Sequence, residues 1–154
     1  MVSMWIYPTE EHSWRCALYV KYETGFFGMI PIAWEGHSSF RIRDSKEVDG
    51  WYDISGCKLQ VNEWSHYVVS YNAKTETAYA YINGQLVGSM KNVPGNRYAK
   101  RIVLGGDVFQ PSFIGKICEV TFYNEIRDHD FVSELHQSYV TRDDFIGFEI
   151  GIDK

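Results

Sequence analysis

The sequence has few of the features that hold a small protein together from outside its core. It contains three cysteines, Cys16, Cys57 and Cys118, and no two of them form a Cys-x-x-Cys pair. An odd number without that spacing argues against a disulfide framework, a zinc ribbon and a dithiol redox motif. Each cysteine lies in an apolar, strand-like stretch, so we expect all three to be small core residues.

Long apolar runs are also missing. No stretch approaches the roughly 20 apolar residues of a membrane-spanning helix. The first residues lack the basic region and the apolar run of a signal peptide. We therefore expect no membrane insertion and no signal peptide in this chain. Either the natural protein is not exported by a signal peptide, or the chain is a piece of a longer one.

An excess of positive charge is missing as well. The formal net charge is -5, whereas phosphate binding requires clustered lysine and arginine. The densest basic stretch, formed by Arg97, Lys100 and Arg101, is typical of a solvated loop beside a strand. Nucleic acid is therefore not an expected partner.

Aromatic residues, by contrast, are abundant. The 154 residues include 11 tyrosines, 9 phenylalanines and 5 tryptophans, which excludes a disordered chain and favours strands. The length suits one domain, residues 1–154, with a sizeable core.

Most of the chain alternates between apolar and polar residues with a period of two, the pattern of half-buried strands. The run 64–71 is apolar on both faces and predicts a central strand. Asn83-Gly84 separates two strand-like runs and predicts a hairpin, because both residues tolerate the positive φ of a type I′ turn. The expected strands cover residues 2–7, 15–22, 27–34, 39–43, 51–54, 58–61, 64–71, 77–82, 85–90, 101–104 and 113–123.

One helix is expected near the end of the chain. Asp128 or Asp130 can cap it, and the apolar residues that follow have helical spacing. We place the helix at about 128–139 and a closing tail strand, where alternation resumes, at about 143–152. About ten short strands with one helix predict an all-β fold, a two-sheet antiparallel β-sandwich or jelly roll.

Five stretches, taken in order, resemble the laminin-G-like domains of the concanavalin A-like jelly-roll family over roughly residues 2–139. They are SMWIYP at 3–8, NEWSHYVVSYN at 62–72, YINGQLVG at 81–88, LGG at 104–106 and FIGKICEVTFYN at 113–124. Such domains often carry an acid where Cys118 stands, so any role of that acid is lost here. They also usually begin with a strand before the one at Val2, and the tail strand is a candidate to fill that edge.

The resemblance implies a function as well as a fold. Members of this family are mostly non-catalytic modules that bind glycans or proteins, sometimes with calcium. They occur in secreted multidomain proteins, toxins and virion or tail proteins. A glycan or another protein is thus the expected partner, at a cell surface, outside the cell or on a virion. A homo-oligomer and neighbouring domains stay open alternatives.

For glycan binding, aromatic rings stack on sugar faces while nearby polar groups fix the hydroxyls. Several aromatic and charged residues flank predicted loops, whereas Trp5 and Trp64 are expected in the core. The candidate ligand-binding residues are Trp34, Trp51, Tyr52, Arg43 and Asp53.

Calcium is the one cofactor that the sequence leaves open, because it requires several oxygen ligands from loops. Asp107, after Gly105-Gly106, is the candidate metal ligand, and Asp44 and Asp53 lie near strand ends. His66 lies in a strand that is apolar on both faces, so we expect a buried, hydrogen-bonded histidine rather than a ligand.

A glycoside hydrolase is a weaker alternative. Such enzymes require two carboxylates that face one groove. On one strand this calls for a pattern such as Glu-x-Asp-x-Glu or a one-residue variant of it. Residues 47–51 read Glu-Val-Asp-Gly-Trp and lack the second glutamate. Asp128 and Asp130 lie at a helix start. We therefore expect a non-catalytic carbohydrate-binding module, with a structural assembly component, such as a phage tail or capsid protein, as the alternative.

Overall fold

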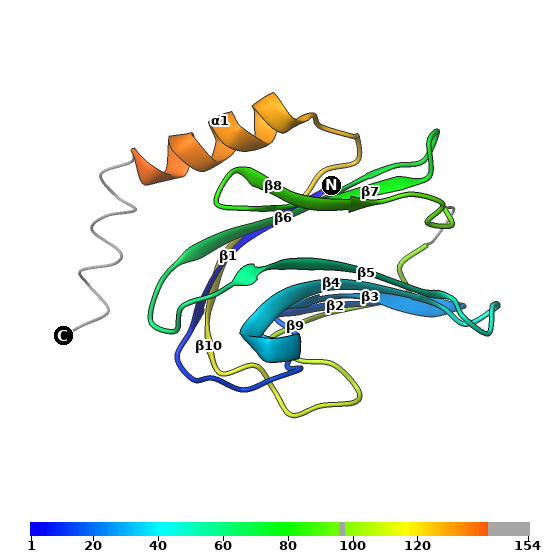
Figure 1. The fold of residues 1–154 in the computed structure, drawn as a ribbon, viewed down its shortest axis with the longest axis horizontal. Coiled ribbons are helices and arrows are strands. Elements are labelled where there is room, and N and C mark those ends of the chain that lie inside the picture. Colours follow the sequence, from blue (N-terminus) through cyan, green and yellow to red (C-terminus); the bar gives the residue numbers. More distant parts are fainter. Residues whose placement is uncertain (96–97, 142–154) are drawn as a thin grey trace.

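The computed structural model describes residues 1–95 and 98–141. Two five-stranded antiparallel sheets pack face to face, and one helix lies on the outer face of one of them (Figure 1). The predicted β-sandwich with one short helix is therefore confirmed.

Sheet A has the strand order β10-β1-β6-β7-β8. Its strands are β1 (Val2–Pro8), β6 (Ser65–Asn72), β7 (Thr77–Ile82), β8 (Gln85–Met90) and β10 (Gly115–Phe122).

Sheet B has the order β5-β4-β3-β2-β9. Its strands are β2 (Leu18–Tyr22), β3 (Gly25–Ile30), β4 (His37–Asp44), β5 (Trp51–Lys58) and β9 (Arg101–Leu104).

The core lies between the two sheets and follows from the alternation along each strand. Met4 and Tyr67 point inward from sheet A, and Met29 and Phe40 point inward from sheet B, all with almost no exposure. The Phe40 and Tyr67 rings meet with centroids 5.3 Å apart. The inner faces of the two sheets thus form one continuous apolar layer.

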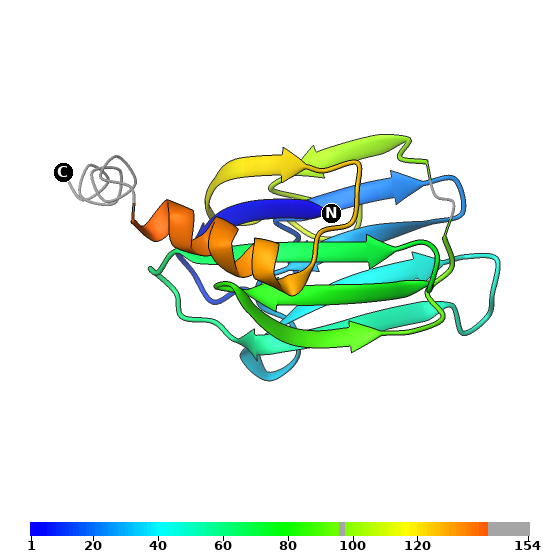
Figure 2. The ribbon, with the colours of Figure 1, turned by 90° about the horizontal axis from the view of Figure 1, so that it is seen from above.

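The outer face of sheet A lies beneath α1 (His129–Val140) (Figure 2). Of the two expected caps, Asp128 is the one that caps this helix, because its carboxylate accepts a hydrogen bond from the Phe131 amide at 3.0 Å. Val132 of the helix is fully buried against Val68 of β6. The central strand β6 is apolar on both faces because one face meets the core and the other meets α1.

The outer face of sheet B is bordered by irregular segments. The short 3-10 helix η1 (Trp34–Gly36), the loop 9–17 and the loop 105–114 all lie on this side of the sandwich (Figure 1). Within residues 1–95 and 98–141, no α-helix covers this face.

Several sequence-based expectations were wrong in detail. Cys16 is buried as expected, but Cys57 is exposed near the end of the edge strand β5 and Cys118 is only half-buried in the edge strand β10. An edge strand lacks a neighbour on one side, so apolar alternation there does not bring full burial. The strand expected at 58–61 is absent, because β5 continues to Lys58 and a turn follows.

Two further expectations concern the strand at 27–34 and the tail strand. The strand expected at 27–34 stops at Ile30, and Trp34 begins η1. The tail strand expected at 143–152 lies outside the described residues. In the described part of the chain, none of the helices has the length and apolar character to cross a membrane.

Candidate functional site

A cleft of about 450 Å³ opens on the outer face of sheet B. Its size falls within the range of small-molecule binding sites, about 300–1,000 Å³. Most of its walls are aromatic, with a few polar groups among them. The lining residues are Trp14, Cys16, Phe26, Ile30, Trp34, Arg41, Trp51, Asp107, Phe109 and Gln110.

The guanidinium of Arg41 is the centre of the cleft. Its central carbon lies 4.7 Å from the ring centroid of Trp14, 4.7 Å from that of Trp34 and 4.9 Å from that of Trp51. Contacts of this kind are favourable by about 0.5–2 kcal/mol each, more when water is excluded. The arginine therefore holds three tryptophans in one constellation.

Asp53 fixes the orientation of Arg41. Arg41 Nε donates to Asp53 Oδ1 at 2.7 Å, and Nη2 donates to Oδ2 at 2.8 Å. This two-pronged geometry matches the planar fork of arginine and is both strong and directional. The two side chains are only about a fifth exposed, at 18% and 21%.

The register of β4 and β5 explains this arrangement. Arg41 stands directly opposite Asp53, and Arg43 stands opposite Trp51. Residues two apart on a strand share a face, so all four side chains point outward from sheet B. Arg43 lies over the Trp51 ring at 4.8 Å.

A glycine makes room for Cys16, one of the residues that line the cleft. Gly28 of β3 pairs with Arg41 of β4. A Cβ atom there would lie 3.2 Å from the sulfur of Cys16. The missing side chain thus lets the Cys16 sulfur lie close against the β3 backbone.

Two of the tryptophans come from irregular backbone rather than from strands. Trp14 has φ +69°, and the residue after Trp34, Glu35, has φ +52°. The Trp14 amide donates to the Ile32 carbonyl at 2.7 Å. The two indole rings then meet edge to face, with centroids 4.4 Å apart, a favoured aromatic geometry.

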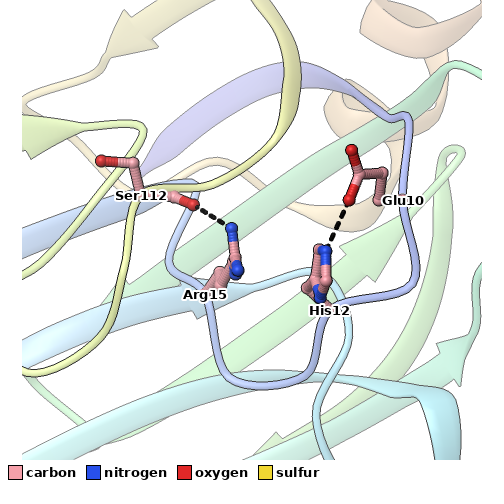
Figure 3. A network of polar contacts seen from close by, with 4 residues as sticks. All are labelled: Glu10, His12, Arg15 and Ser112. Atoms are coloured by element: carbon pink, nitrogen blue, oxygen red, sulfur yellow. Dashed lines mark hydrogen bonds and ion pairs between the residues drawn. The ribbon is translucent and has the colours of Figure 1, made fainter.

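The loop that carries Trp14 is tied to the opposite wall of the cleft. Arg15 Nη1 donates to the Ser112 carbonyl at 2.9 Å, and His12 contacts Glu10 at 2.5 Å within the loop (Figure 3). Ser112 belongs to the loop 105–114, which also carries Phe109. The two loops therefore hold opposite walls of the cleft in a fixed relation.

Asp107 adds the acidic group of the cleft. Its Oδ1 accepts hydrogen bonds from the amides of Phe109 at 2.6 Å and Gln110 at 2.7 Å. Burial, together with the nearby Asp107 carboxylate, raises the pKa of the Cys16 thiol, so the thiol keeps its proton.

Of the five predicted ligand-binding residues, two line the cleft, two contact its residues and one lies on the other face of the sheet. Trp34 and Trp51 line the cleft and are about half exposed, at 48% and 50%. Asp53 holds Arg41, and Arg43 lies on Trp51. Tyr52 faces the other side of β5, packs against the core and donates to Glu47 at 3.0 Å. Consecutive strand residues point to opposite faces, so Trp51 and Tyr52 do not share a site.

Several residues of the cleft did not emerge from the sequence. Arg41 lies two residues before Arg43, so strand alternation alone predicts that the two share a face. Phe26 lies on β3 opposite Arg43, so alternation and strand pairing place it on the same face. Trp14 and Phe109 carry no comparable signal, because their contribution depends on how two loops fold over sheet B.

The acidic residues considered for calcium are dispersed. Asp53 binds Arg41, Asp44 accepts the Lys46 amide at 3.0 Å, and Asp107 accepts two loop amides. Over residues 1–95 and 98–141, no group of three or more metal-binding side chains is found.

A second and larger hollow, of about 510 Å³, opens between the sheets at one end of the sandwich. Met1, Tyr22 and Tyr98 are among its lining residues, and within the described residues no charged side chain lines it. Its polar side chains are tyrosines, whereas the cleft on sheet B is lined by both an arginine and an aspartate. The smaller cleft on sheet B, with its arginine and aspartate, is thus the better candidate site.

Solved structures share this fold. Domain 4 of AbnA, a GH43 extracellular arabinanase from Geobacillus stearothermophilus, in complex with arabinotriose, is 24% identical with a TM-score of 0.76, over 88% of this chain and 65% of that one. The CBM40 of the Ruminococcus gnavus IT-sialidase bound to α2,3-sialyllactose is 13% identical with a TM-score of 0.70, over 88% and 80%. The binding domain of botulinum neurotoxin serotype D is 15% identical with a TM-score of 0.74, over 92% and 36%.

The chain thus spans less than two thirds of the first and third of these structures. No curated protein matches it significantly. The family model of the concanavalin A-like lectin/glucanases superfamily, however, matches residues 2–133. The chain therefore belongs to the concanavalin A-like lectin/glucanase superfamily.

Proposed function

We propose that this chain is a non-catalytic carbohydrate-binding module whose ligand lies in the cleft on sheet B. The observation that carries the proposal is the pair of half-exposed tryptophans, Trp34 and Trp51, which both contact Arg41. Each ring centroid lies within 4.9 Å of the same arginine carbon, so the two rings are at most about 10 Å apart.

The chemistry of these groups suits a sugar. The weakly polar C–H face of a sugar ring packs on an aromatic ring, while hydrogen bonds fix its hydroxyls. Trp34 and Trp51 offer rings, Arg41 offers N–H donors, and Asp107 offers carboxylate acceptors. Arg41 and its three tryptophans are held before any ligand arrives, which lowers the entropy lost on binding.

The structural neighbours support the same function class. The three solved structures above are a domain in complex with arabinotriose, a domain bound to sialyllactose and a toxin binding domain. One of them is part of an extracellular enzyme. We accordingly propose that this chain acts outside the cell; a place on a virion stays a prediction.

A glycan array followed by titration calorimetry tests the proposal. The array is run with calcium and again with a chelator. We expect at least one glycan to bind, and Trp34→Ala and Trp51→Ala each to weaken it by about tenfold or more, equivalent to about 1.4 kcal/mol. Both rings are half exposed, so neither substitution should unfold the domain.

Leu86→Ala is the matched control. Leu86 is equally exposed, at 49%, but it lies on β8 of the other sheet. Its removal should leave the affinity unchanged. Equal affinity of Trp51→Ala and the wild type would remove the cleft from the binding site, and a blank array on folded protein would contradict the proposal itself.

Assembly with other proteins is the second candidate function. Several large apolar side chains on or beside the edge strands β9 and β10 are exposed: Ile102, Leu104, Val108, Phe109 and Phe122. Exposed apolar groups beside open sheet edges are typical of protein contacts. A concentration-dependent change in sedimentation, together with a blank array, would favour this role.

A further inference from the structure

The charged groups of the cleft restrict which sugar it can accept. Arg41 is the only arginine or lysine among the cleft-lining residues of the described chain. Its edge formed by Nε and Nη2 is occupied by Asp53, with bonds of 2.7 and 2.8 Å. Arginine binds an incoming carboxylate best through two parallel N–H groups on one edge, and one of its two such edges is already taken.

Aromatic rings also surround the Arg41 guanidinium. Trp14, Trp34 and Trp51 lie within 4.9 Å of its central carbon. The β4–β5 pairing holds Asp53 directly opposite Arg41, so the charge of Arg41 is balanced before any ligand arrives. Nη1 makes no hydrogen bond within the described residues, so it remains a donor for ligand oxygens.

Asp107 makes the cleft unfavourable for negative charge. No ion pair joins it to a lysine or arginine among the described residues. Among the charged side chains that line the cleft, Arg41 is balanced by Asp53, so Asp107 leaves one negative charge in the lining. Like charges brought together in a partly water-excluded site oppose each other by several kcal/mol.

Two other arginines lie near the cleft but are engaged elsewhere. Arg43 lies over Trp51 and donates to the carbonyls of Asp44 and Glu47. Arg15 donates to the Ser112 carbonyl. Neither of them lines the cleft.

We infer that the ligand of this cleft is an uncharged, hydroxyl-rich sugar, rather than a sialic acid or a uronic acid. One hydroxyl oxygen accepts from Arg41 Nη1, and another hydroxyl donates to the Asp107 carboxylate. The sugar face packs on Trp34 or Trp51. This inference rests on the proposed function and narrows it, because structural neighbours of this chain are bound to both neutral and acidic sugars.

The test is an array that carries neutral and carboxylated glycans in matched pairs. Lactose and sialyllactose differ only by one acidic sugar, and arabinotriose is a second neutral probe. We expect the glycans that bind to be neutral, and the carboxylated member of each pair to bind at least about tenfold more weakly. Tighter binding of the carboxylated members would overturn the inference.

Asp53→Asn supplies the sharper test. It removes the negative charge that balances Arg41, so the preference for neutral over carboxylated glycans should fall by about tenfold or reverse. Asp107→Asn, on a partly exposed loop, should shift the preference in the same direction, and it serves if Asp53→Asn folds poorly. Asp130→Asn, which makes the same charge change at the start of α1, is the matched control.

The results separate this inference from the proposed function. Neutral glycans that lose affinity in Trp51→Ala support both. Carboxylated glycans that lose affinity in Trp51→Ala support the module but overturn the inference. An unchanged preference in both Asp53→Asn and Asp107→Asn would also overturn it. If no glycan on the array binds, both ideas fail.

Discussion

His66 shows how a single residue can serve the fold rather than a site. It is fully buried in β6, and its Nε2 lies 2.8 Å from the Ser3 hydroxyl. Its ring stacks on Trp5 and on His136 of α1, with centroids 5.0 and 5.6 Å away. The expectation of a buried, hydrogen-bonded histidine is confirmed, and this residue joins sheet A to its helix.

This burial makes stability depend on pH. Burial, with a smaller contribution from His136, lowers the pKa of His66 from 6.5 to about 3. Burial lowers the pKa of His136 as well. Between about pH 3 and pH 6.5, the two pKa values of His66, the unfolded chain binds more protons than the folded one, so stability rises with pH. The full contribution is present above about pH 6.5 and is lost as the pH falls toward 3.

We expect His66 alone to lower the free energy of unfolding by about 2 kcal/mol between pH 7.5 and pH 5. Urea unfolding at the two pH values measures it. His66→Gln, which keeps a neutral polar side chain, should show a shallower loss than the wild type. His12→Gln, on an exposed loop, is the control and should retain the full loss. Equal slopes in all three proteins would contradict the assignment to His66.

At the scale of elements, α1 depends on its cap and on its apolar face. Asp128 satisfies the Phe131 amide, one of the backbone donors that the first turn of a helix leaves unpaired. Val132 and Tyr139 bury the side that faces sheet A. Gly84, at the turn between β7 and β8, has a φ of +76°. A Cβ atom there would lie 3.1 Å from His136 Cβ, so the glycine also lets α1 pack closely on this turn.

We expect Asp128→Ala to destabilise the domain by about 1 kcal/mol, because the Phe131 amide loses its acceptor. Asp128→Asn keeps an acceptor oxygen and should remain close to the wild type. Chemical unfolding of the three proteins measures the difference. A loss of the same size in both variants would show that the charge of Asp128, rather than its hydrogen bond, stabilises the helix.

At the scale of the whole molecule, the two sides of the sandwich differ. β5 and β8, the edges on one side, lie close to each other, whereas β9 and β10 end their sheets on the other side. An edge strand exposes unpaired backbone groups. The resemblance to laminin-G-like domains implies a further strand before the one at Val2, and residues 143–152 remain the predicted candidate to fill that edge.

Deleting residues 143–154 tests that prediction. If these residues close an edge, the melting temperature should fall, by about 2–4 °C for each kcal/mol of stability lost. Deleting residues 153–154 alone is the control and should have little effect. An unchanged melting temperature after the longer deletion would show that the tail does not close the sandwich.

The sequence by itself determined the sandwich, the Asn83-Gly84 hairpin, the α1 cap and the burial of His66. All of these follow from local signals: the period of two along strands, turn residues, and a capping acid before helical spacing. Such signals depend on neighbours in the chain, so they can be recognised without the fold.

Only the tertiary structure decided the cleft. The cross-strand register placed Asp53 beside Arg41, and irregular backbone carried Trp14 and Trp34 over the same face. Strand alternation then turned Tyr52 away while it kept Trp51. Arg41, Asp53 and the two loop tryptophans are far apart in the sequence, so only strand pairing and loop packing bring them together. Trp51 and Tyr52 are neighbours in the sequence, but they lie on opposite faces of β5.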